Sequence, residues 1–212
     1  MSMKKTLQAA TIVASVFLAS GANALSLGGI GGALGGGSGD SVDFGATEGE
    51  VVGLINTSLK NLSKAQSIML DALGLKDEAA VAEKNAQDLE KGDITGKDEL
   101  ADKIKNSKSL SDKIVAKLKQ KEALSAEAKK KFGTGILPYG KGVIAGISGA
   151  KKAADALKSM SSNPMNLTKF GTLVYVGKEA PGLLSMFADA TSAIKDFSTH
   201  QGIKTDELES GL

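Results

Sequence analysis

Few residues in this chain are of the types from which active sites are built. The sequence has one histidine, His200, and neither cysteine nor arginine. A Ser–His–Asp triad would have to use His200, and Ser148, in Gly-Ile-Ser-Gly, stands one position away from the serine of a Gly-x-Ser-x-Gly nucleophile elbow. We predict that His200 is a solvated residue at the end of the last helix, where the helix dipole favours a cation. The inventory therefore indicates a protein that is not an enzyme.

Metal and nucleotide sites are not indicated either. A closed zinc site needs several cysteine or histidine ligands, which this chain lacks. The segment 135–142 resembles a phosphate loop only in its glycines, because Lys141 is followed by Gly142 and not by the hydroxyl residue that holds magnesium. The carboxylate pairs Asp77–Glu78 and Asp98–Glu99 are adjacent, so they point to different faces of a helix. We predict no metal, no cofactor and no small-molecule substrate.

The first 24 residues have the pattern of a cleavable secretory signal. Lys4 and Lys5 form a basic start, residues 9–20 form a short apolar stretch, and Ala22-Asn23-Ala24 has the small-x-small pattern that a signal peptidase accepts. The apolar stretch is too short to span a hydrocarbon core, which needs roughly 20 residues. We predict cleavage between Ala24 and Leu25 and a mature protein that is periplasmic or secreted.

Processing at that bond changes the charge balance. All 26 bases are lysines, and two of them leave with the signal, so the mature chain has as many bases as acids and is formally neutral. A neutral chain without arginine lacks the basic patch and the guanidinium groups that nucleic-acid recognition uses. The absence of cysteine excludes disulfides and thiol chemistry. We therefore predict that the protein does not bind nucleic acid.

The chain beyond the signal divides into three parts. Residues 25–42 are rich in glycine, which loses too much backbone entropy to hold a helix or strand unaided, and they predict a disordered leader. A flexible tether is favoured there over a docking segment. Residues 43–201 predict a single all-α domain, and residues 202–212 predict an acidic, frayed tail.

Apolar residues recur at helical spacing through the whole predicted domain, and no segment alternates with the period of a strand. Thr47 and Glu50 are spaced as a capping box that begins the first helix, and Gly74 is expected to end it in a left-handed conformation. Pro181 is expected to kink or split the last helix. The expected helices are 47–73, 77–91, 98–118 with a continuation to Phe132, 138–160 and 167–199, with a further cap at Thr95. These patterns predict a bundle of four to six helices.

Charge is distributed unevenly over these helices. The segment of about 76–131 is dense in charges of both signs and predicts a charged helical hairpin that packs outside or projects as an arm, whereas the region after it is apolar. Within that apolar region small residues recur at helical steps, and such rows let two helix backbones approach closely. The candidates for helix packing or interaction are Gly142, Gly146, Gly149, Ala145 and Ala153.

These features favour an exported, non-enzymatic helical binding or scaffold protein that engages another protein or itself in the bacterial cell envelope. The alternative, from another class, is a membrane-active or pore-forming protein that inserts the glycine-rich segment 133–150. Against that alternative, charged residues follow the segment at once and Pro138 shortens its continuous helix.

Overall fold

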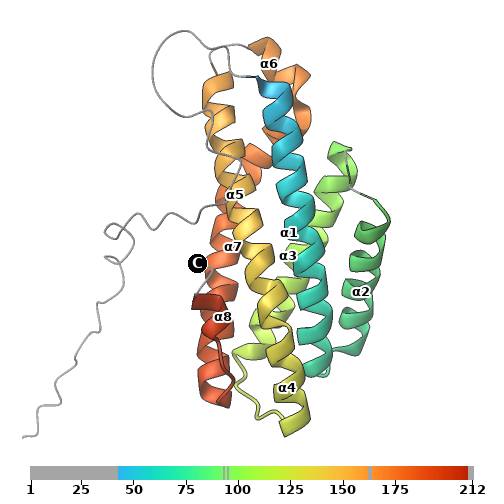
Figure 1. Ribbon diagram of the computed structural model, residues 1–212, viewed down its shortest axis with the longest axis vertical. Coiled ribbons are helices and arrows are strands. Elements are labelled where there is room, and N and C mark those ends of the chain that lie inside the picture. The colour runs from blue at the N-terminus through green and yellow to red at the C-terminus, as the bar shows by residue number, and fades with distance from the viewer. Residues whose placement is uncertain (1–42, 93, 95, 162–163, 210–212) are drawn as a thin grey trace, which may run out of the picture. The chain divides into compact units, whose positions relative to one another are not determined.

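The computed structural model describes residues 43–92, 94, 96–161 and 164–209, all of which are helical or lie in connections between helices. The predicted signal peptide (1–24), the predicted leader (25–42) and Thr95 lie outside these residues. The described chain forms α1 (Phe44–Ala72), α2 (Lys76–Lys91), α3 (Lys97–Leu118), α4 (Ala126–Thr134), α5 (Ile136–Met160), α6 (Pro164–Lys169), α7 (Gly171–Gln201) and α8 (Asp206–Glu209) (Figure 1). Six of these helices have nine residues or more. The predicted all-α bundle is confirmed.

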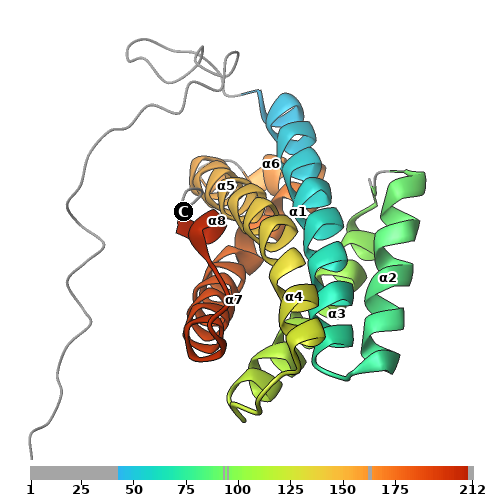
Figure 2. The ribbon, with the colours of Figure 1, turned by 60° about the horizontal axis from the view of Figure 1, so that its bottom comes forward.

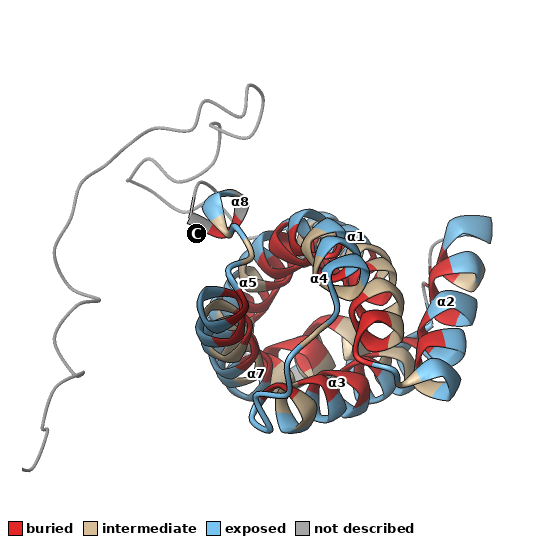
Figure 3. Ribbon diagram, turned by 90° about the horizontal axis from the view of Figure 1, so that it is seen from below, coloured by how far each residue is buried: buried red, intermediate tan, exposed pale blue. Residues whose placement is uncertain are grey.

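Four helices form a closed ring around the core. In the order α1, α5, α7, α3, each packs against the next, and α3 returns to α1 (Figure 3). Buried residues face the inside of this ring, as their red colour in Figure 3 shows, and exposed residues face outward. Apolar side chains that are almost fully buried come from all four helices, among them Leu62, Met69, Leu100, Ile136, Leu173 and Ile194. This burial is the main stabilising contribution to the fold.

Side-chain contacts give the direction of each helix in the ring. Along α1 the contacts of Leu62, Ser58 and Ile55 with Gly142, Gly146 and Gly149 of α5 run in opposite order, so α1 and α5 are antiparallel. Tyr139 of α5 reaches Thr191 of α7, whereas Gly177 of α7 faces Ala153 of α5, so these helices are antiparallel too. Asn56 of α1 contacts Ile94, just before α3, and Gln66 contacts Ser107 further along α3, so α1 and α3 are parallel. Helices α1, α3 and α7 therefore run in one direction and α5 in the other.

Helix α2 lies outside the ring. It packs mainly against α1, on the side away from α5 and α7, and makes few contacts with α3 (Figure 2). Four small or medium apolar residues form its buried face: Ala79, Ala82, Ala86 and Leu89. Of the two long helices in the charged segment 76–131, only α2 has the expected outer position. Helix α3 joins the ring, burying Leu100, Ile104 and Ile114 despite its charged outer face.

The start and the end of α1 test the predicted caps. The N-cap is Asp43, whose carboxylate accepts hydrogen bonds from the backbone N–H groups of Gly45 and Ala46, so the capping box predicted at Thr47 and Glu50 is wrong. At the other end Gly74 has φ +79°, and Leu75 N–H donates to the Leu70 carbonyl at 2.8 Å. This is the left-handed stop expected at Gly74, and it is confirmed.

The third expected helix does not continue to Phe132. Helix α3 ends at Leu118, and α4 begins after Ser125, whose hydroxyl accepts the Ala128 N–H. The connection between α3 and α4 runs across one end of the ring, and α4 lies at the rim beside α1 (Figure 3). Phe132, fully buried, packs there against Phe197 of α7 with ring centroids 5.4 Å apart. The turn between α3 and α4 lets Phe132 close this end of the core.

Two expectations for the C-terminal region are also corrected. Helix α7 is assigned as one helix from Gly171 to Gln201 with Pro181 inside it, so the expected split does not occur. Packing of α7 against both α3 and α5 offsets the hydrogen bond that proline cannot donate. Within the tail predicted to be frayed, Asp206–Glu209 forms α8, and Leu208 is fully buried where α8 packs on α5.

Candidate functional site

The predicted row of small residues lies inside the bundle. A Cβ built at Gly142 would stand 3.0 Å from the Leu62 backbone nitrogen, and one at Gly149 would stand 3.0 Å from Ile55 Cδ1. At Gly146 the same atom would come within 2.5 Å of Phe187 Cζ in α7. The row therefore brings the backbone of α5 close to α1 and α7.

The two alanines of the predicted set are buried as well. Ala145 is 8% exposed and Ala153 is fully buried. A Cβ built on Gly177 of α7 would stand only 2.8 Å from the Ala153 carbonyl oxygen. Helix α7 therefore also needs a glycine where it approaches α5. All five candidates therefore contribute to packing within one chain, and none of them presents an exposed side chain to a partner.

The residues considered for catalysis are not assembled into a site. His200 is exposed at the end of α7, as expected. Ser148 is exposed within α5, and its hydroxyl donates to the Ile144 carbonyl one turn earlier at 2.9 Å. The glycine-rich segment 135–142 is the first part of α5 and not a loop. Among the described residues, no group of histidine, aspartate and glutamate side chains is placed to hold a metal.

Two side-chain amides that the sequence did not single out hold connecting segments against the ring. Asn56 of α1 donates to the Ile94 carbonyl at 2.8 Å and accepts the Ile94 N–H at 3.0 Å. Gln201 of α7 donates to the Glu122 carbonyl at 3.0 Å and accepts the Leu124 N–H at 3.2 Å. Each amide forms the two hydrogen bonds that a neighbouring backbone segment would otherwise supply. The backbone N–H and C=O groups of both connecting segments are therefore paired although no strand lies beside them.

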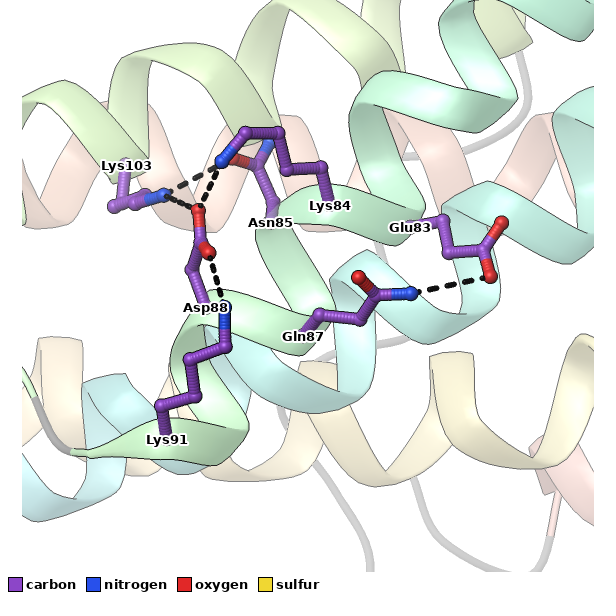
Figure 4. A network of polar contacts seen from close by, with 7 residues as sticks. All are labelled: Glu83, Lys84, Asn85, Gln87, Asp88, Lys91 and Lys103. Carbon is purple, nitrogen blue, oxygen red and sulfur yellow. Dashed lines mark hydrogen bonds and ion pairs between the residues drawn. The ribbon is translucent and has the colours of Figure 1, made fainter.

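A cluster of charges joins α2 to α3 around Asp88 (Figure 4). Lys84 and Lys91 donate to its carboxylate at 2.9 and 3.3 Å, and Lys103 Nζ lies 3.6 Å from it. Lys103, whose side chain is only 17% exposed, also donates to Asn85 Oδ1 at 3.1 Å. These hydrogen bonds, led by the one from Lys84, lower the pKa of Asp88 to about 2. The cluster ties the outer helix to the ring.

The Asp88→Asn variant is expected to have a lower melting temperature, because the three lysines around position 88 lose the carboxylate that they contact. The lowered pKa means that the stabilisation is fully present above about pH 4, the ordinary aspartate value, and is lost as the pH falls through about 2. The melting temperatures of the parent protein and of the variant should therefore converge as the pH falls over that range. Added salt should reduce the difference between their melting temperatures at neutral pH. Asp155→Asn is the matched control, since Asp155 pairs only with Lys158 on an exposed surface. An equal loss in the two variants would contradict the prediction.

An open groove with a volume of about 520 Å³ lies between α3 and α7. Small residues, Ser192 and Ala193, are part of its lining on α7. Its apolar part is built from Val115 and Leu118 of α3 and from Met186, Ala193 and Phe197 of α7. We refer to this hollow as the α3–α7 groove. Its volume lies in the range of roughly 300–1,000 Å³ that is usual for ligand pockets, and its lining is partly apolar.

Three exposed carboxylates line the α3–α7 groove. Asp112 belongs to α3, whereas Asp189 and Asp196 lie seven residues apart on α7, so they share one face. None of the three forms an ion pair with a described residue; Asp189 only accepts a hydrogen bond from the Ser185 hydroxyl at 3.5 Å. Lys119 and Lys121, at the end of α3, line the groove as well, so it combines an apolar floor with charges of both signs.

The chain matches no protein-family model, no curated protein and no solved structure. Within residues 43–209, as far as they are described, no helix is both long enough and apolar enough to cross a membrane.

Proposed function

We propose that this chain is an exported, non-enzymatic helical binding protein, and that its α3–α7 groove takes a segment of another protein in the bacterial cell envelope. The observation that carries the proposal is the groove itself, in which apolar side chains are accessible between carboxylates and lysines that have no ion-pair partner among the described residues. Burial of the floor would supply binding free energy in proportion to the apolar area removed from water.

The charges of the groove define the chemistry of the partner. Asp189 and Asp196 on the α7 wall favour a lysine or arginine beside them, whereas Lys119 and Lys121 at the end of α3 favour an acidic group there. The partner segment is therefore expected to present apolar side chains flanked by charges, with its cations beside α7. Because the carboxylates are exposed, their contribution falls as salt is added.

Export is the second part of the proposal, and the basic start, short apolar stretch and small-x-small site of residues 1–24 support it. N-terminal sequencing of the protein recovered from outside the cytoplasm should find Leu25 first. A recovered protein that keeps Lys4 and Lys5 would contradict export by cleavage.

Binding at the groove can be tested with a photo-crosslinking amino acid. We place it at Ser192, which lines the groove, and in a second variant at Val81, which is 52% exposed on α2 far from the groove lining. Illumination of cells that produce the full chain should give a defined adduct from position 192 and not from position 81. The adduct should be lost when Asp189 and Asp196 are replaced by lysine. Equal adducts from both positions, or adducts that persist after the charge reversal, would refute the proposal.

A further inference from the structure

We propose that α2 is a lid on the outer side of α1 and α3, and that it opens while the four helices of the ring stay folded. Three features of α2 support this: a small apolar contact with the ring, ion pairs that water reaches, and fixed points at both ends of the helix. The lid and the α3–α7 groove are separate features, so neither proposal depends on the other.

The apolar contact that holds α2 is small. Its buried apolar side chains are three alanines and Leu89, and its other large apolar residue, Val81, is 52% exposed. Helix α3, which is also rich in charges, buries five large apolar side chains: Leu100, Ile104, Leu110, Ile114 and Leu118. Hydrophobic stabilisation scales with the apolar area removed from water, so the release of α2 costs far less free energy than the release of a ring helix.

Ion pairs supply much of the remaining contact between α2 and the ring. In three of them the carboxylate belongs to α2 and the lysine to α1 or α3: Glu78–Lys113 at 2.9 Å, Asp88–Lys103 at 3.6 Å and Glu90–Lys64 at 2.6 Å. Hydrogen bonds from lysines lower the pKa of all three carboxyl groups. Except for Lys103, each of these side chains is between 26% and 50% exposed, so added salt weakens the attraction.

The chain is fixed to α1 on both sides of α2. Before it, the left-handed stop at Gly74 and the hydrogen bond from Leu75 to Leu70 end α1. After it, Asn56 of α1 forms two hydrogen bonds with the backbone of Ile94. Opening is therefore a local loss of the contacts of α2 between these two points, and it requires no movement of a ring helix.

Opening of α2 changes the surface of the ring on the side away from α5 and α7 (Figure 2). Lys64, Lys103 and Lys113 lose their carboxylate partners, and the apolar surface of α1 on which α2 packs meets solvent. Lys103 changes most, since only 17% of its side chain is exposed while α2 is closed. The lid therefore controls access to a face that is both basic and apolar.

The absence of cysteine from the sequence allows opening to be measured with a single introduced thiol. Ala82→Cys places the thiol under α2, and Ala65→Cys places it on α1 inside the ring; both alanines are fully buried. In native buffer, iodoacetamide should modify position 82 at least ~10-fold faster than position 65, which only unfolding of the ring exposes. Added salt should speed the reaction at position 82 several-fold and leave position 65 nearly unchanged.

Further substitutions test the ion pairs as the control of the lid. Glu78→Gln with Glu90→Gln should speed modification of position 82, whereas Asp155→Asn, which removes an exposed pair outside α2, should not. Hydrogen exchange of the parent protein gives the same test without a thiol, since the amides of α2 should exchange as one group before those of α5. Equal modification at the two positions, or exchange of α2 only together with α5, would overturn the proposal. A rate at position 82 that ignores both salt and the double substitution would refute control by the ion pairs.

Discussion

Gly146→Leu should destabilise the bundle by about 1–3 kcal/mol or more, which is the usual effect of overpacking a filled core. Even the first added atom has no room, because a Cβ at this position would lie 2.5 Å from Phe187 Cζ and 2.7 Å from Ser58 Oγ. Helix α5 would have to move away from both α1 and α7. This loss exceeds the gain of roughly 1 kcal/mol that a better helix former brings. Chemical denaturation of the single variant measures it, and Gly146→Ala should act in the same direction.

Gly53→Ala is the matched control, with the opposite sign expected. Gly53 lies in the middle of α1 and is exposed, and nothing stands within 4 Å of a Cβ built on it. Alanine there should raise the stability by roughly 1 kcal/mol through helix propensity alone. A rise in the melting temperature of Gly146→Leu would show that the row of glycines is not a close helix contact.

Asn56→Ala is expected to be the second large loss. It removes both hydrogen bonds to Ile94, a residue that is only 5% exposed, and leaves its N–H and its carbonyl without their partner. A buried polar group left unpaired costs about 1–3 kcal/mol. We expect the denaturation midpoint to fall accordingly, and hydrogen exchange of the Ile94 amide to become faster.

Asn61→Ala separates this effect from a general effect on α1. Asn61 donates to the Thr57 carbonyl one turn earlier at 2.9 Å, just as Asn56 donates to the Val52 carbonyl at 3.0 Å, but it has no partner outside the helix. Its replacement should therefore change the stability little. Similar losses in the two variants would mean that the contact with Ile94 is not what Asn56 contributes.

Features that depend on local sterics were predictable from the sequence. The end of α1 requires a residue that adopts a positive φ at low free-energy cost, which glycine does. The sequence therefore shows a glycine, Gly74, directly after the apolar stripe of the helix. The row of small residues in α5 is visible for a similar reason, because close helix contact excludes larger side chains at Gly142 and Gly146. In both cases the steric constraint restricts which residue type can occupy the position, so it is visible in the sequence.

Features set by distant partners were not predictable. Glu50 fits a capping box, yet it pairs with Lys152, which is 102 residues away. The break after Leu118 is stabilised by Gln201, and the burial of Leu208 depends on α5, so neither leaves a local pattern.

The α3–α7 groove belongs to this second group. Asp112, Asp189 and Asp196 look like ordinary solvated residues until the parallel packing of α3 and α7 brings them to one hollow. The spacing of residues within either helix does not predict the groove, because its two walls are far apart in the sequence.

The order of the helices along the chain has a consequence for the timing of folding. Glu48 of α1 accepts the backbone N–H groups of Thr172 and Leu173 at the start of α7, 124 and 125 residues later. Helix α1 can pair early with α2, its neighbour in sequence, but the face that meets α5 and α7 stays uncovered until most of the chain is available. Contacts of such long separation slow folding. A chain that emerges N-terminus first would therefore remain incompletely folded until its last long helix is released.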